Sequence, residues 1–276
     1  LADAFSTSVL IISEDNDQRA VDILSESIEK IEKAFELAKN NEAQRKRLVG
    51  AKYDLLAKRS IRSVSLFTEE KEKQEKLLAD VSGNLINAAQ TFKELQSDKT
   101  AASCHGCACL YTGLKKFKEG IMSCRLKLIA DAHEEFKHAS DFYKKAESEV
   151  GEDVISTINV VVSEIEVFYD AFNAGGKLTI REYLPIYEHI NNLIEQISAV
   201  GLKNMFKAYI FDDAMNIVDE KMAKQKEGIT VIHKGTGDFV IGGGATIIKN
   251  SLVENSFNKI KEGYGEDVAK ALQQIA

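Results

Sequence analysis

The residue types best suited to metal or redox chemistry gather in one short part of the chain. The string CHGCAC, residues 104–109, is followed by a further cysteine at position 124, and together they account for all four cysteines. Thiolates and imidazoles together bind zinc in tetrahedral sites. A metal or redox centre would therefore use Cys104, His105, Cys107, Cys109 and Cys124.

The same cysteines also fit the buried face of a helix, and we favour this interpretation. Cys104 and Cys107 share a three-four spacing with Tyr111 and Leu114, which places both sulfurs on an apolar stripe. A buried cysteine behaves as a small hydrophobic residue. A zinc site would also bring a second ligand pair at similar spacing, whereas Cys124 stands alone. We therefore expect reduced, metal-free thiols and no cofactor.

Other chemically suggestive patterns have simpler structural explanations. Glu135 and His138 form the Glu-x-x-His pair of di-iron bundles, but no second copy follows, so a solvated helix face is favoured. The glycines of residues 235–244 lack the P-loop lysine and suit hairpin turns. A basic stretch from Arg45 to Arg62 has no accompanying aromatic series for nucleic-acid stacking and is also expected to be a solvated face. No nucleophile motif comes with a base, so we expect no enzyme activity.

Composition and charge narrow the class of protein further. The 276 residues carry a net charge of -7, which argues against nucleic acid as a main partner. The most apolar stretch, Val154 to Phe172, includes Glu164, Glu166 and Asp170, which are costly in lipid, so it is expected to be a buried helix. Clustered cysteines, unlike a scattered disulfide framework, favour a reducing and therefore cytoplasmic location.

Three-four periodicity predicts a mainly α fold, an array or bundle of long antiparallel helical hairpins. One helix is expected within Asp15–Asn40 and a shorter one around Tyr53. A long helix is expected to open at Thr68, its candidate N-cap, and to carry an apolar stripe from Leu78 to Leu95. Further helices are expected near residues 100–121, 123–148, 153–173, 179–199 and 202–225, with breaks at Gly151 and at the pair of glycines 175–176. Pro185 either kinks its helix or shifts the start of that helix to Leu184.

The pattern changes after Gly228, which divides the chain into a predicted helical domain of residues 1–227 and a C-terminal segment of residues 228–276. The segment has β-forming residues between glycine turns and then an amphipathic helix, which predicts a small β-hairpin plus a terminal helix. The hairpin carries more apolar surface than it could leave exposed. Its candidate partner-binding residues are Phe239, Ile241, Ile247 and Ile248.

The segment AHEEFKHASDFYKKA, Ala132 to Ala146, alternates small alanines with Phe136, Phe142 and Tyr143. It resembles one helix of the tetratricopeptide-like α-helical repeats. The resemblance implies a scaffold that binds peptides or proteins, and it covers one helix only.

The leading functional hypothesis is therefore a non-catalytic protein-interaction scaffold or adaptor with a protein partner. Two alternatives stay open. A helical pore-forming protein would insert the glycine-rich hairpin into a membrane, and a metal or redox sensor would use the cysteine cluster.

Overall fold

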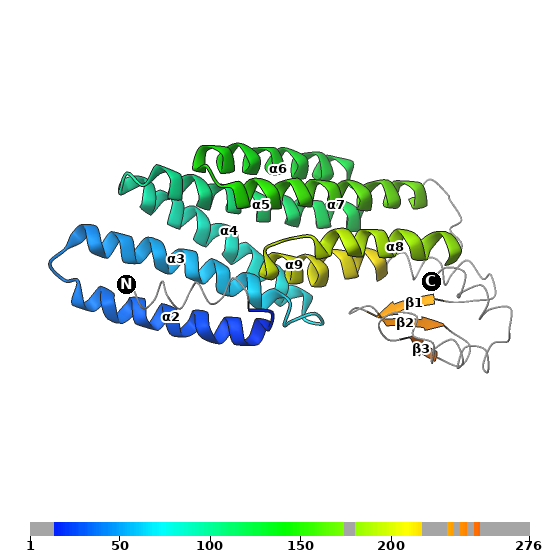
Figure 1. Cartoon of the computed structure of the whole chain (residues 1–276), viewed down its shortest axis with the longest axis horizontal. Helices are drawn as coiled ribbons and strands as arrows, with labels where there is room; N and C mark the ends of the chain where they lie inside the picture. Colours follow the sequence, from blue (N-terminus) through cyan, green and yellow to red (C-terminus); the bar gives the residue numbers. More distant parts are fainter. Residues whose placement is uncertain (1–13, 174–179, 217–230, 235–237, 242–245, 249–276) are drawn as a thin grey trace. The chain divides into compact units, whose positions relative to one another are not determined.

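The computed structural model describes residues 14–173, 180–216, 231–234, 238–241 and 246–248, and helices dominate them (Figure 1). The predicted mainly α fold class is confirmed. In chain order the elements are α2 (Asp17–Leu37), α3 (Glu42–Val64), α4 (Lys71–Glu94), α5 (Asp98–Ser123), α6 (Leu126–Ala146), α7 (Glu149–Asn173), α8 (Ile180–Glu195), α9 (Val200–Phe206), the π-helical turn η1 (Lys207–Phe211), β1 (Val231–Lys234), β2 (Asp238–Ile241) and β3 (Thr246–Ile248).

The chain divides into two compact units. The first comprises Leu1–Val160 and Ile194–Tyr209, and the second comprises Val161–Leu193 and Ile210–Ala276. The predicted boundary between residues 227 and 228 falls outside the described residues and stays a prediction.

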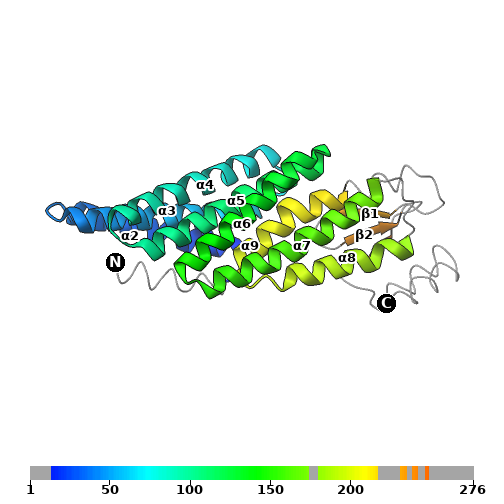
Figure 2. The ribbon, with the colours of Figure 1, turned by 90° about the horizontal axis from the view of Figure 1, so that it is seen from above.

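Sequential hairpins build the first unit. Short connections make each of α2 to α6 pack on its neighbour in the chain. Figure 2 shows that the axes of these helices are roughly aligned. Asn16 and Asn41 cap α2 and α3, since each side-chain oxygen accepts a backbone N–H of the first turn. The apolar stripes of these two helices then meet in a core that includes Leu24, Ile31 and Leu48.

Three glycines at seven-residue spacing let α5 and α6 approach closely. Gly106, Gly113 and Gly120 are seven residues apart on α5. A Cβ added at Gly113 would lie 2.6 Å from the ring of the buried Phe136 on α6, and one at Gly106 would lie 3.0 Å from the ring of Tyr143. The two aromatic side chains of α6 therefore occupy the space that side chains on α5 would otherwise fill.

A buried polar cluster joins the first hairpin to α9. Asp17, the first residue of α2, accepts hydrogen bonds from Arg62 at 2.8 Å, from Asn204 at 3.0 Å and from Ser65. The Asp17 and Arg62 side chains are 9% and 5% exposed. Arg62 was predicted to lie on a solvated face, and that prediction is wrong because the carboxylate of Asp17 neutralises its charge inside the fold. Arg45 and Arg47 of the same basic stretch are exposed as expected.

Two predicted helix starts differ from the structure. Helix α4 begins at Lys71 instead of being capped by Thr68, because the chain from Leu66 to Glu70 forms consecutive turns. Gly151 does not break a helix but lies in the first turn of α7. Ser148 caps that turn, and its Oγ accepts the Gly151 N–H at 3.2 Å.

Two later helices also differ. Pro185 lies inside α8, which begins at Ile180, so the alternative start at Leu184 is wrong. The single helix predicted over residues 202–225 is instead α9 followed by η1 and a further helical stretch to residue 216, and the rest of the predicted range lies outside the described residues. An inserted π-helical turn leaves little trace in a three-four pattern, which explains the missed interruption.

In the second unit, the rings of Tyr187 on α8 and Phe211 pack with centroids 5.1 Å apart.

The stretch of α7 predicted to be buried does bury one face, including Ile158, Val162 and Ile165, although Val167 is exposed. Strand β2 pairs antiparallel with β1 and β3. Within the described part of the chain, no helix combines the length and apolarity needed to cross a membrane.

Candidate functional site

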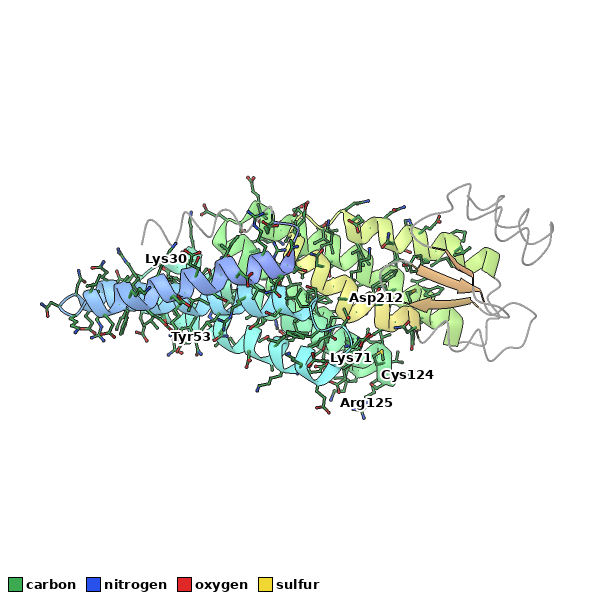
Figure 3. All side chains as sticks on the ribbon, turned by 90° about the horizontal axis from the view of Figure 1, so that it is seen from below. Lys30, Tyr53, Lys71, Cys124, Arg125 and Asp212 are labelled. Atoms are coloured by element: carbon green, nitrogen blue, oxygen red, sulfur yellow. The ribbon has the colours of Figure 1, made fainter. Side chains whose placement is uncertain are left out.

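The four cysteines do not converge on one point. Cys104 is buried against Ala88 and Ala89, with Tyr53 packed at the same place. Cys107 is half-buried and its sulfur accepts a hydrogen bond of 3.2 Å from the hydroxyl of Tyr143. Cys109 is also half-buried, and Cys124 is exposed at the turn between α5 and α6. Figure 3 shows Cys124 well separated from Tyr53, the residue that packs beside Cys104.

The environment of the three inner thiols makes them weak nucleophiles. Burial raises the pKa of Cys104 to about 12 and the pKa of Cys109 to about 11, where the Glu135 carboxylate adds to the effect. Burial also raises the pKa of Cys107. Because the thiolate is the form that binds metals and attacks electrophiles, these groups are chemically quiet near neutral pH.

The remaining metal-ligand candidates are also dispersed. His105 stacks on Phe142 with ring centroids 5.1 Å apart. Glu135 accepts a hydrogen bond of 2.7 Å from Lys116, while His138 is exposed, so the Glu-x-x-His pair does not form a shared site. Among the residues that the structure describes, no group of three or more His, Cys, Asp or Glu side chains could hold a metal ion.

One face of α5 instead forms a wall of a cleft in the first unit. Ser103, Cys107, Leu110 and Tyr111 follow one another at helical spacing along this wall. A stripe on α3, the end of α6 and the starts of α7 and α9 also line the cleft, whose volume is about 380 Å³. The aliphatic side chains that line it are Ile61, Leu110, Val150, Val154, Ala199, Val200 and Leu202.

Two glycines keep the cleft walls close to their supports. A Cβ added at Gly151 would lie 2.3 Å from the ring of Tyr143, and one at Gly201 would lie 2.7 Å from the Nε atom of Arg62. Both glycines line the cleft, and both partner side chains do too. The buried Arg62–Asp17 cluster thus fixes the position of α9 relative to α3.

The polar side chains of the cleft are rich in hydrogen-bond donors. Lys58 extends from α3 and donates to Asp54 at 2.7 Å, although 51% of its side chain is exposed. Burial by itself would lower the pKa of Lys58, but the charge of Asp54 and the hydrogen bond to it outweigh this and raise that pKa. The ammonium is therefore fully protonated near neutral pH.

Tyr111 adds a second polar group to the same space. Its side chain is 6% exposed, and within the described residues its hydroxyl makes no hydrogen bond to protein. Burial raises the pKa of Tyr111 well above its usual range. Its hydroxyl is thus a neutral donor that is available to a ligand.

The predicted partner-binding residues lie elsewhere. Phe239 and Ile241 belong to β2, and Ile247 and Ile248 belong to β3, with Phe239 opposite Ile248 in the backbone register. The surroundings of their side chains lie outside the described residues, so their role stays a prediction.

Sequence reasoning placed Cys107 and Tyr111 on a buried stripe but missed the cleft. Two sequence patterns pointed toward the cleft. Ser103 and Cys107 share one face of α5, and Lys58, Ile61 and Arg62 share one face of α3 at three-four spacing. Nothing in either stripe says that the two face each other, because α4 lies between them in the chain.

Comparisons with known proteins add no relative to this picture. No protein-family model matches the chain, and neither curated proteins nor solved structures show a significant match to it.

Proposed function

We propose that this protein is a non-catalytic interaction scaffold, in the manner of tetratricopeptide-like helical repeats, and that it binds a short segment of a protein partner in the cleft between α3, α5, α7 and α9. The observation that carries the proposal is this cleft, in which aliphatic side chains from separate helices surround a few polar groups. Sites for short ligands have this composition. The three inner thiols, which are protonated near neutral pH, favour a scaffold over a redox sensor.

The rim of the cleft supports docking of a chain segment. The side chain of Val150 is 69% exposed although it lines the cleft, and an exposed aliphatic group at the edge of an apolar cleft gains most when a partner covers it. The predicted C-terminal hairpin and helix provide a second contact region in this proposal. The free thiols support a reducing, cytoplasmic setting.

The test is selection of short random peptides against the whole chain. Selected peptides are then titrated into a Val150→Trp variant, whose emission reports on the rim because the native chain contains no tryptophan. The matched control is Val160→Trp, which lies on the same helix at an exposed position outside the cleft. We expect a saturable emission change for Val150→Trp and none for Val160→Trp.

A blocking variant decides whether the peptides occupy the cleft. Ser103→Phe adds a ring to the α5 wall, while Ser156→Phe adds the same ring at an exposed position of α7. Ser103→Phe should weaken binding by about tenfold or more, which is about 1.4 kcal/mol, and Ser156→Phe should not. Failure to select any peptide, or equal binding to both variants, would refute the proposal.

A further inference from the structure

The lining of the cleft has a charge pattern that selects a class of ligand. It includes the cations Lys58 and Arg62 and the hydroxyls of Ser103 and Tyr111, but no aspartate or glutamate. Because lysine and arginine side chains only donate hydrogen bonds, the lining favours a ligand whose polar end accepts them. An anionic acceptor gains more than a neutral one, because it adds Coulomb attraction to the lysine charge and because a bond from a neutral hydroxyl is stronger when its acceptor is ionised.

The two cations differ in how readily they can turn to a ligand. Arg62 is held inside the fold by Asp17, and separating a buried pair is strongly unfavourable. Lys58 is half-exposed, and its partner Asp54 lies four residues earlier on the same helix, outside the cleft lining. A pair of this kind contributes little to stability, so a ligand can share the Lys58 ammonium with Asp54 at small cost.

The rest of the lining fixes the body of the ligand. Val154 and Leu202 are 5% and 4% exposed and lie in the wall of the cleft. They offer a ligand no hydrogen-bonding group, so an apolar body is favoured here because a polar body would lose its water without gaining a partner. The volume of about 380 Å³ is at the small end of the range for ligand sites, so it suits a small molecule as well as a short partner segment.

We propose that the cleft binds a small apolar monocarboxylic acid, with its carboxylate at Lys58 and Tyr111 and its apolar chain against Val154 and Leu202. The acid is a free small molecule in this proposal. The same chemistry is offered by the C-terminal carboxylate of an apolar peptide, which the experiment separates from it. The proposal concerns the cleft assigned above to a partner segment, but it does not depend on a protein partner.

Calorimetric titration of the full chain with decanoate is the test. Decanol and decyltrimethylammonium carry the same apolar chain without the negative charge, and acetyl-Leu-Leu supplies a peptide carboxylate. Decanoate should bind saturably, and both uncharged and cationic probes should bind at least about tenfold more weakly, because neither can form an ion pair with the Lys58 ammonium. Acetyl-Leu-Leu should also bind more weakly than decanoate.

Substitutions locate the carboxylate. Lys58→Gln should weaken decanoate binding by about tenfold, whereas Lys52→Gln, on the same helix but outside this cleft, should not. Tyr111→Phe provides an independent variant that removes only the hydroxyl and should weaken binding severalfold. The proposal is overturned if decanol binds as tightly as decanoate, if both lysine variants behave alike, or if acetyl-Leu-Leu binds while decanoate does not.

The test of acid binding can fail or succeed independently of the test of the scaffold proposal. Library peptides that Ser103→Phe displaces, together with no decanoate binding, would leave the scaffold standing and refute the acid. Decanoate binding that depends on Lys58, with no selected peptide, would do the opposite.

Discussion

Two glycine-to-alanine substitutions in neighbouring helices should change stability in opposite directions. Gly83 on α4 is exposed, and a Cβ added there meets no atom within 4 Å. A Cβ added to Gly113 on α5 would lie 2.6 Å from Cε1 of Phe136 and 3.2 Å from the carbonyl oxygen of Ala132. Both changes give the helix a better helix former, so only the packing differs.

The magnitudes follow from this difference. Replacing glycine by alanine inside a helix stabilises the protein by about 0.5–1 kcal/mol, and Gly83→Ala should show this gain. Overpacking a filled core costs about 1–3 kcal/mol. The Phe136 ring is 1% exposed and cannot move into solvent, so Gly113→Ala should lose about 1–2 kcal/mol net.

Urea unfolding of the Val150→Trp variant is the assay, because its single tryptophan reports on the first unit. The unfolding midpoint should rise for Gly83→Ala and fall for Gly113→Ala, with unchanged slopes. Adding Phe136→Leu to Gly113→Ala should recover stability relative to the sum of the two single changes, because the smaller side chain leaves room for the new methyl group. Midpoints that move in the same direction, or strictly additive effects, would refute the close approach of α5 and α6.

Further predictions concern the buried polar cluster and the thiols. Asp17→Asn should reduce the free energy of unfolding by about 3–5 kcal/mol because it removes the charge of a buried carboxylate that pairs with Arg62, and chemical denaturation should show no comparable change for the exposed Glu32→Gln. With Ellman's reagent at pH 8, Cys124 should react fast and the other cysteines much more slowly until the chain unfolds, so fast labelling that survives Cys124→Ser would contradict the low reactivity of the three inner thiols. The raised pKa of Cys104, about 12, keeps its proton on the folded chain while the unfolded thiol loses its own near an ordinary pKa of about 8.5. The folded state then binds more protons, so stability should fall as pH rises through this window, and Cys104→Ala should make the pH dependence of the denaturation midpoint shallower.

The sequence by itself determined the helices and the faces they bury. Their apolar spacing predicts the stripes of α2 and α4, and the position of Cys104 beside Tyr111 on one stripe correctly indicates a buried thiol. This succeeds because helix periodicity is local, and each residue's face follows from its distance along the chain. The helix ends were less secure, since Thr68 and Ser148 are both reasonable caps and only the path of the neighbouring chain decides between such residues.

Only the tertiary structure decided which faces meet. The seven-residue spacing of Gly106, Gly113 and Gly120 is visible in the sequence, but the reason for it depends on the side chains that α6 places against these glycines. Arg62 and Asp17 are 45 residues apart in the chain, and their burial as a pair depends on the packing of α9 against α3. The cleft likewise joins Lys58, Tyr111 and Leu202 from separate helices. Such contacts depend on the relative orientation of helices, and a local periodic pattern carries no information about distances between residues so far apart in the chain.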